Sequence, residues 1–227
     1  MSQIVSQFIF FRVRPSVKPE DPSSDDGRGL TRVCDMTKVQ SGHNSSAWGR
    51  VCEDKNTIAW VVEWSDAHST TNLRLLDPFL ATENPLPVVS LYVTMSPPIC
   101  DTETLTKNPV TELCTLLFPG DYDVADLREL NADLINFRTA LLEQLPPSER
   151  PRSWSMGHVD RPSKMPHEYS PNGQAFAHFL AVGWDSVDAH MKARETEIFK
   201  GSIASLREKM LRPLPGLELK HVSFQKL

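Results

Sequence analysis

The sequence predicts an α+β chain in which two tandem ferredoxin-like repeats, each with the order β-α-β-β-α-β, close one barrel within a single chain. A short pattern recurs: Ile58–Trp64 precedes Ser65–His68, and Phe176–Trp184 precedes a segment that ends in Asp188–His190. Apolar periodicity also gives the two halves the same succession of strands and helices. One such sheet carries helices on one face only, so two copies can cover each other's bare faces.

The first half begins with a strand over 4–14 that is rich in Phe, Ile and Val and is followed by prolines, which central strands exclude. Apolar spacing predicts a helix near 30–40. A polar turn at 53–56 joins two hairpin strands. The remaining elements of this half are the hairpin strands 47–52 and 57–64, a short helix over 66–76 and a strand over 87–95.

The second half repeats this order with longer helices. Asp123 is a good N-cap for an amphipathic helix over 123–145. A proline-containing insertion over 160–173, with a solvated His167, separates the middle strands. The other elements are strands 111–118, 152–159, 174–184 and 216–226 and a helix over 186–210. The first repeat is therefore 1–97, the linker 98–109 and the second repeat 110–227.

Composition excludes several classes of function. With 24 basic and 29 acidic side chains the net charge is −5, which disfavours non-specific binding to nucleic acid. No apolar run approaches the length of a membrane span, and the first residues do not resemble a secretory signal, so we expect a cytoplasmic protein away from membranes. The four cysteines form no Cys-x-x-Cys pair, and nucleotide-binding glycine motifs are missing, so neither a metal nor a cofactor is expected.

Histidines are the main catalytic candidates because their pKa lies near neutrality. His43 lies in a dense polar segment just after the first predicted helix, with Asn44 and Ser45 beside it and Trp48 nearby. Such a loop could deliver a general acid or base and polar groups to a substrate. The alternative is a solvated loop whose histidine interacts with the helix end.

Strand alternation places Trp154, Met156 and His158 on one face, where the imidazole could line an apolar cleft. The alternative for His158 is a histidine at the strand end that is hydrogen-bonded to the backbone. His178 alternates with apolar residues on the neighbouring strand and either lines that cleft or is a hydrogen-bonded core residue. For the tryptophans, ordinary core packing is the alternative to substrate binding.

His190 and Arg194 stand at i and i+4 on the last predicted helix. Together they could bind a phenolate or carboxylate, because the planar guanidinium suits such groups. A solvated helix face that carries an ion pair is the alternative.

The segment 183–199, the paired strands that end in Trp64 and Trp184, and the tandem element order resemble the dimeric α/β barrel superfamily. The likeness is strongest to fungal proteins with tandem antibiotic-biosynthesis-monooxygenase-type domains, which include chalcone-isomerase-like members. The resemblance implies ligand sites between each sheet and its helices. It also implies a range of activities, from cofactor-free monooxygenases and polyketide cyclases to stress proteins without known chemistry.

These observations lead to three functional hypotheses. The first is a cofactor-independent isomerase or cyclase of secondary metabolism, in which His43 or His158 moves a proton on a small aromatic or polyketide ketone. The second is a cofactor-free monooxygenase, and the third a non-catalytic ligand-binding or stress-response barrel. We expect a monomer that completes its own barrel, with a homodimer as the alternative.

Overall fold

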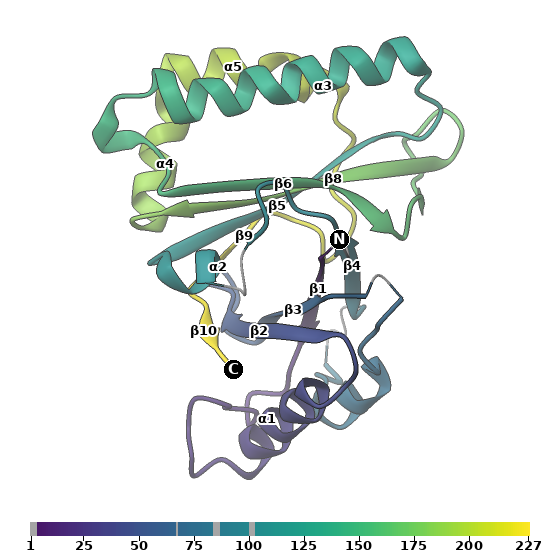
Figure 1. Cartoon of the computed structure of the whole chain (residues 1–227), viewed down its shortest axis with the longest axis vertical. Helices are drawn as coiled ribbons and strands as arrows, with labels where there is room; N and C mark the ends of the chain where they lie inside the picture. Colours follow the sequence, from purple (N-terminus) through teal and green to yellow (C-terminus); the bar gives the residue numbers. More distant parts are fainter. Residues whose placement is uncertain (1–3, 67, 84–86, 100–102) are drawn as a thin grey trace.

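The computed structural model describes residues 4–66, 68–83, 87–99 and 103–227 (Figure 1). Its first half runs from an N-terminal strand through one long helix and a hairpin to a fourth strand. The elements of this half are β1 (Val5–Arg12), α1 (Asp25–Lys38), β2 (His43–Arg50), β3 (Thr57–Trp64), the 3-10 helix η1 (Leu73–Phe79) and β4 (Val89–Val93).

The second half has the same strand order and more helix. A short helix, α2 (Glu103–Lys107), precedes it. Its strands are β5 (Val110–Pro119), β6 (Ser153–Arg161), β7 (Met165–Pro166), β8 (Gln174–Trp184), β9 (Lys220–Val222) and β10 (Gln225–Lys226). Its helices are α3 (Val124–Thr139), the π-helical turn η2 (Ala140–Gln144), the 3-10 turn η3 (Pro147–Glu149), α4 (Val187–Glu195) and α5 (Glu197–Lys209).

The strands form one curled antiparallel sheet in the order β10-β2-β3-β1-β4-β6-β8-β5-β9, and β7 pairs with β8. Within each half the strands follow the ferredoxin-like order, in which the first strand lies between the third and the fourth. β4 joins the halves through β6. The halves also meet where the residues after β2 contact β9. There Val51 forms a β-bridge with Val222, and the Cys52 amide donates to the His221 carbonyl at 2.8 Å.

Equivalent positions in the two halves make equivalent contacts. Trp64 faces Val5 across its strand pair, and Trp184 faces Val110. The Trp64 indole N–H donates to Gln7 on β1 at 2.9 Å. In the second half the Trp184 indole N–H donates to Glu112 on β5 at 3.0 Å. The recurring pattern in the sequence therefore corresponds to a recurring tryptophan anchor.

A glycine occupies the second strand of each half where the other half crosses it. Gly49 pairs with Ala59 and Gly157 with Phe179, and both partners stand five residues before the tryptophan that ends their strand. A Cβ atom on Gly49 would lie 2.3 Å from the Ser223 carbonyl oxygen. These two positions, which we call the seam glycines, allow the backbones of the halves to meet.

The buried apolar side chains form three clusters that pack the sheet and the helices together. An inner cluster, which includes Phe8, Phe10 and Phe179, draws its side chains from strands of both halves. The second-half cluster fills the space between the sheet and helices α3, α4 and α5, which lie over one face in Figure 1. The first-half cluster packs α1 against the opposite end of the molecule.

Several predicted elements differ from the structure because local capping overrides apolar periodicity. α1 begins at Asp25, well before the predicted start, because Ser24 caps it and two aspartates occupy its first turn. The helix predicted over 66–76 is the later 3-10 helix η1, since the Thr71 backbone and hydroxyl are held by Gln7. Residue 67 of that prediction and residues 100–102 of the linker lie outside the described residues.

The helix predicted over 186–210 is two helices. Thr196 adopts an extended backbone, donates its hydroxyl to the Ala193 carbonyl and accepts from the Phe199 amide, so it ends α4 and caps α5. His167, expected in solvent, is 3% exposed, with its Nε2 atom 2.8 Å from the Arg212 carbonyl. Within the described residues, no helix combines the length and apolarity that crossing a bilayer requires.

Candidate functional site

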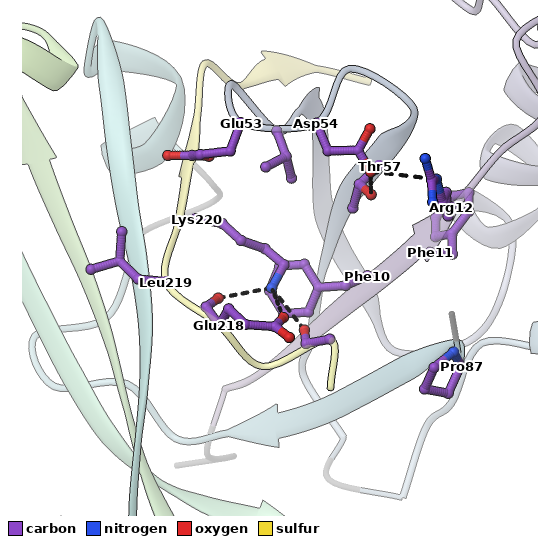
Figure 2. Close-up of a pocket in the computed structure, with 12 residues that line it drawn as sticks. Phe10, Phe11, Arg12, Glu53, Asp54, Thr57, Pro87, Glu218, Leu219 and Lys220 are labelled. Atoms are coloured by element: carbon purple, nitrogen blue, oxygen red, sulfur yellow. Dashed lines mark hydrogen bonds and ion pairs between the residues drawn. The ribbon is translucent and has the colours of Figure 1, made fainter. Parts of the chain in front are cut away.

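A partly open cavity of about 150 Å³ lies where the C-terminal end of β1 meets the β2–β3 turn and the segment that leads into β9. Figure 2 shows Phe10 and Lys220 at its centre and Arg12 and Pro87 on one side. Phe11, Val51 and Leu219 complete an apolar lining. A volume of this size accommodates one aromatic ring. The remaining lining residues are Glu53, Asp54, Thr57, Gly216 and Glu218.

The Asp54 side of the cavity is a rigid turn. The Asp54 carboxylate accepts from the Asn56 amide at 3.0 Å and from the Thr57 hydroxyl at 2.8 Å. It also lies 3.5 Å from the Arg12 guanidinium. These contacts shape the turn and hold its backbone, so Asp54 is committed to structure.

Glu53, the next residue in this turn, is bound to a buried histidine. Its Oε1 atom lies 2.5 Å from Nδ1 of His221, and its Oε2 atom accepts from the His221 amide at 3.1 Å. Burial acts to raise the pKa of Glu53, but the hydrogen bonds from His221 hold it below the ordinary value. The side chain is 46% exposed and belongs to the cavity lining, and its carboxylate is bound to His221. Glu53 is therefore an accessible carboxylate with a proton partner behind it.

Lys220 supplies the buried positive charge of the cavity, and the Glu218 carboxylate lies 3.6 Å from its ammonium. The other lining cation, Arg12, is paired with Asp54. The Lys220 ammonium donates to the carbonyls of Gly216 and Glu218 at 2.8 Å each and lies 5.1 Å from the Phe10 ring centre. Desolvation by burial lowers the pKa of Lys220. A cation fixed beside an apolar, ring-sized space can stabilise an oxyanion that forms there.

The residues predicted around His43 do not line this cavity. The His43 ring lies edge-on to Trp64, and its Nε2 atom is 3.4 Å from the Ser46 hydroxyl. Desolvation lowers the pKa of His43. Ser45 is buried and donates to Glu63 at 2.6 Å, while Asn44 is exposed. Trp48 packs against the first-half cluster.

The residues predicted on the sixth strand and its neighbour form a separate group on the helix-facing side of the second half. Trp154 packs in the cluster edge-on to Phe137, and Met156 packs against the same cluster. His158 and His178 face each other across β6 and β8 with ring centres 5.4 Å apart. Burial lowers the pKa of His178 to about 4, with His158 as a smaller cause. This group shares a face, as alternation predicts, and it lies away from the cavity lining.

His190 and Arg194 do not form a solvated stripe. His190 is 1% exposed, stacks on Trp184 with ring centres 4.9 Å apart, and places Nδ1 2.7 Å from Nε2 of His221. Arg194 is half-buried on the same helix. Predicted His190 thus lies behind the cavity acid Glu53, connected through His221.

Sequence reasoning missed Glu53, Glu112 and Lys220 and left His221 without a role. A signal was present, because Glu112 is the one charged residue of the strand predicted over 111–118, and Lys220 and His221 stand together in a predicted strand. Across the described parts of the chain, no three His, Cys, Asp or Glu side chains are grouped to hold a metal ion.

No protein-family model and no curated protein sequence matches the chain. Solved structures do match over nearly its whole length. An anthrone oxidase-like protein aligns with a TM-score of 0.57 at 13% identity, covering 100% of this chain and 94% of the other. The chain has the ferredoxin-like fold of these proteins.

Two further matches have the same character. A protein from Fusobacterium nucleatum, provisionally assigned as a monooxygenase, aligns with a TM-score of 0.52 at 11% identity, covering 100% of this chain and 93% of the other. A mutant chlorite dismutase from Candidatus Nitrospira defluvii aligns with a TM-score of 0.51 at 12% identity, covering 98% of this chain and 92% of the other. None of these neighbours is described as an isomerase, so the chalcone-isomerase-like part of the predicted resemblance has no support.

Proposed function

We propose that this protein is a cofactor-independent monooxygenase that oxidises a small aromatic substrate with an acidic C–H or O–H group. The observation that carries the proposal is a ring-sized apolar cavity with a carboxylate in its lining, Glu53, backed by His221, and a fixed ammonium, Lys220, in its wall. The fold shared with an anthrone oxidase-like protein favours this hypothesis over the isomerase or cyclase hypothesis.

The chemistry needs no reductant other than the substrate. For an activated methylene the balance is R₂CH₂ + O₂ → R₂C=O + H₂O. Glu53 accepts the substrate proton, directly or through one water molecule, and leaves an enolate-like anion. This anion transfers an electron to O₂, the two radicals combine, and the resulting peroxide takes back a proton. Loss of the second C–H proton with cleavage of the O–O bond forms the ketone and releases water.

Two side chains divide this work. Glu53 acts as the base, and its low pKa keeps it ionised and ready to accept a proton at neutral pH. The Lys220 ammonium stabilises the negative charge that develops on the substrate oxygen and on the peroxide. The apolar side chains of the lining lower the local dielectric constant around the Lys220 ammonium, which strengthens its effect.

We further propose that residues 1–97 and 110–227 are structural repeats whose sheets close one barrel. The matched tryptophan anchors, the seam glycines and the bridge from Val51 to Val222 support this division. Under this proposal the cavity lies at one end of the barrel, and not between a sheet and its helices as the resemblance implied.

The test measures oxygen uptake and product mass for the metal-free protein with a panel of single-ring phenols, enolisable aryl ketones and anthrones, in air and without oxygen. A product that gains oxygen only in air supports the proposal. A product of unchanged mass formed without oxygen would replace it with the isomerase or cyclase hypothesis.

The decisive variant is Glu53→Gln, which keeps the size of the side chain and removes the base. We expect turnover to fall by about 10²–10⁴-fold, the usual contribution of a general base. Glu208→Gln, on the exposed face of α5, is the matched control with unchanged turnover. Unchanged turnover in Glu53→Gln would show that another group is the base.

A further inference from the structure

Behind Glu53, a line of buried groups leads from the cavity into the space between β5 and α4. Glu53 contacts Nδ1 of His221, and Nε2 of His221 lies 2.7 Å from Nδ1 of His190. Nε2 of His190 then lies 3.3 Å from Oε2 of Glu112. His221 and Glu112 are direct partners across β9 and β5, so both side chains emerge on the same face of the sheet. The line thus joins an accessible carboxylate to a buried one through two imidazoles.

The order of contacts determines where each proton lies. The ionised Glu53 is only an acceptor, so His221 donates through Nδ1 and its Nε2 carries a lone pair. That lone pair accepts from Nδ1–H of His190, which leaves Nε2 of His190 as an acceptor that faces Glu112. This nitrogen has no aligned hydrogen bond within the described residues, and a protonated Glu112 would supply one after a small rotation. These positions describe the line with Glu53 ionised and the stored proton on Glu112.

Further groups hold the buried end of the line in place. The Trp184 indole N–H donates to Oε2 of Glu112, and the Trp184 ring stacks on His190. Burial raises the pKa of Glu112 to about 7, against the Trp184 hydrogen bond and the charge of Arg194. Burial also lowers the pKa of His190 to about 3, with His221 and Arg194 as smaller causes. A proton held in this buried pair therefore resides on the carboxyl.

We propose that Glu112 is a proton store for Glu53 and that His221 and His190 carry protons between them. The proposal rests on the proposed function, because it assigns Glu53 as the group that exchanges protons with the substrate. His190, His221 and Glu112 are positioning residues, since none of them lines the cavity and all act through Glu53.

Each proton transfer in the line conserves protons and changes only where they sit. Transfer to Glu112 starts with both imidazoles protonated on Nε2. Glu53, having taken a substrate proton, gives it to Nδ1 of His221, Nε2–H of His221 gives its proton to Nδ1 of His190, and Nε2–H of His190 gives its proton to ionised Glu112. Both imidazoles are then protonated on Nδ1. Glu53 is again a carboxylate and Glu112 a neutral acid. The reverse sequence returns the proton to Glu53 for the peroxide. The charge of Arg194 from α4 acts on Glu112, and the Cys114 thiol from β5, which burial keeps neutral, lies close to both groups. Lys220 from β9 acts on Cys114 and on Glu53.

The first half has the same anchor without the line of acids and histidines. There Gln7 replaces Glu112, and Thr71 donates its hydroxyl to the Gln7 amide oxygen at 3.0 Å. An amide thus fits this tryptophan contact in the same fold. Glu112→Gln should therefore keep the structure while removing the titrating group.

The experiment compares the wild type with Glu112→Gln in two measurements. Infrared spectroscopy follows the C=O band of a buried carboxylic acid against pH, and kinetics follow kcat and KM over the same range. We expect a band that loses intensity as the pH rises through about 7 and is missing in Glu112→Gln. We also expect kcat to rise through the same pH in the wild type, because Glu112 must be ionised to receive a proton.

In Glu112→Gln the rise of kcat with pH should disappear. Above neutral pH its kcat should be about 10–100-fold below that of the wild type, with KM unchanged. This loss is smaller than the full contribution of a general base, because Glu53 remains in place. Glu63→Gln is the matched control, because Glu63 and Glu112 are the buried acids of the described residues. It should retain the band that titrates near neutrality.

The two measurements separate the two proposals. A neutral-pH band that persists in Glu112→Gln, or an unchanged pH profile of kcat in this variant, would overturn the proton store. A wild-type protein that oxidises none of the substrates would overturn the proposed function alone, because the infrared titration does not depend on turnover.

Discussion

Replacing the seam glycine Gly157 by alanine should push β6 away from the end of β4 and lower the stability of the fold. A Cβ atom built on Gly157 lies 2.2 Å from the Thr94 carbonyl oxygen and 2.7 Å from Cγ1 of Val93. Real Cβ contacts essentially never fall below 3.0 Å, so β6 and the end of β4 must move apart. The obstacle is a backbone atom held by strand pairing and by Asp160, which accepts from the Thr94 amide at 3.1 Å.

This geometry determines the size of the effect. Inserting a methyl group into a packed site costs about 1–3 kcal/mol, and the upper end applies because a backbone oxygen cannot rotate away. For a chain of this length, about 3 kcal/mol corresponds to a fall in Tm of about 6–12 °C. Gly49→Ala should act alike, since its Cβ would lie 2.3 Å from the Ser223 oxygen.

The assay is thermal and urea unfolding followed by tryptophan fluorescence. Gly201→Ala is the control: it lies in α5 with no heavy atom within 4 Å of the new methyl group, so it should stabilise by about 0.5–1 kcal/mol. A Gly157→Ala protein as stable as the wild type would refute close contact between the halves at this seam, and with it the reasoning for a continuous sheet.

Two further predictions concern stability. The pKa of Glu112 is raised to about 7 in the folded state, so its stabilising contribution is complete below pH 4.5 and is lost as the pH rises through 7. In urea titrations over that range, the free energy of unfolding of Glu112→Gln should therefore gain up to about 3 kcal/mol relative to the wild type. A difference that does not change with pH would contradict the assigned protonation. The Trp154 indole N–H has no hydrogen-bond partner within the described residues, whereas the Trp184 indole N–H donates to Glu112. Trp184→Phe should therefore lower the free energy of unfolding by about 1–3 kcal/mol more than Trp154→Phe in the same assay. Equal losses of stability would contradict the role of the indole contact.

Much of the fold follows from the sequence because local periodicity and capping decide it. The alternation over 174–184 and the capped amphipathic pattern after Asp123 predict β8 and α3 closely. Predictions are less accurate where one side chain caps or holds the backbone, as at Ser24, Thr71 and Thr196. The single predicted helix over 186–210 becomes two because a threonine hydroxyl competes with helical hydrogen bonds.

The candidate site was less predictable because its parts come from distant segments. Histidine content and spacing directed attention to His43, His158 and His190, and only His190 connects with the cavity. Glu53 and His221 are 168 positions apart and meet only when β9 lies beside the end of β2. The catalytic roles predicted for the other candidates stay predictions.

By itself the sequence determined most element types and the recurring tryptophan pattern, because these depend on residues close together along the chain. Tertiary structure alone decided which polar groups are buried together. The pKa of Glu112, the partner of Glu53 and the burial of His190 all depend on the pairing of β5 with β9 and the packing of α4. Such contacts join residues far apart in the sequence, and their electrostatic effects arise only when folding removes water from them.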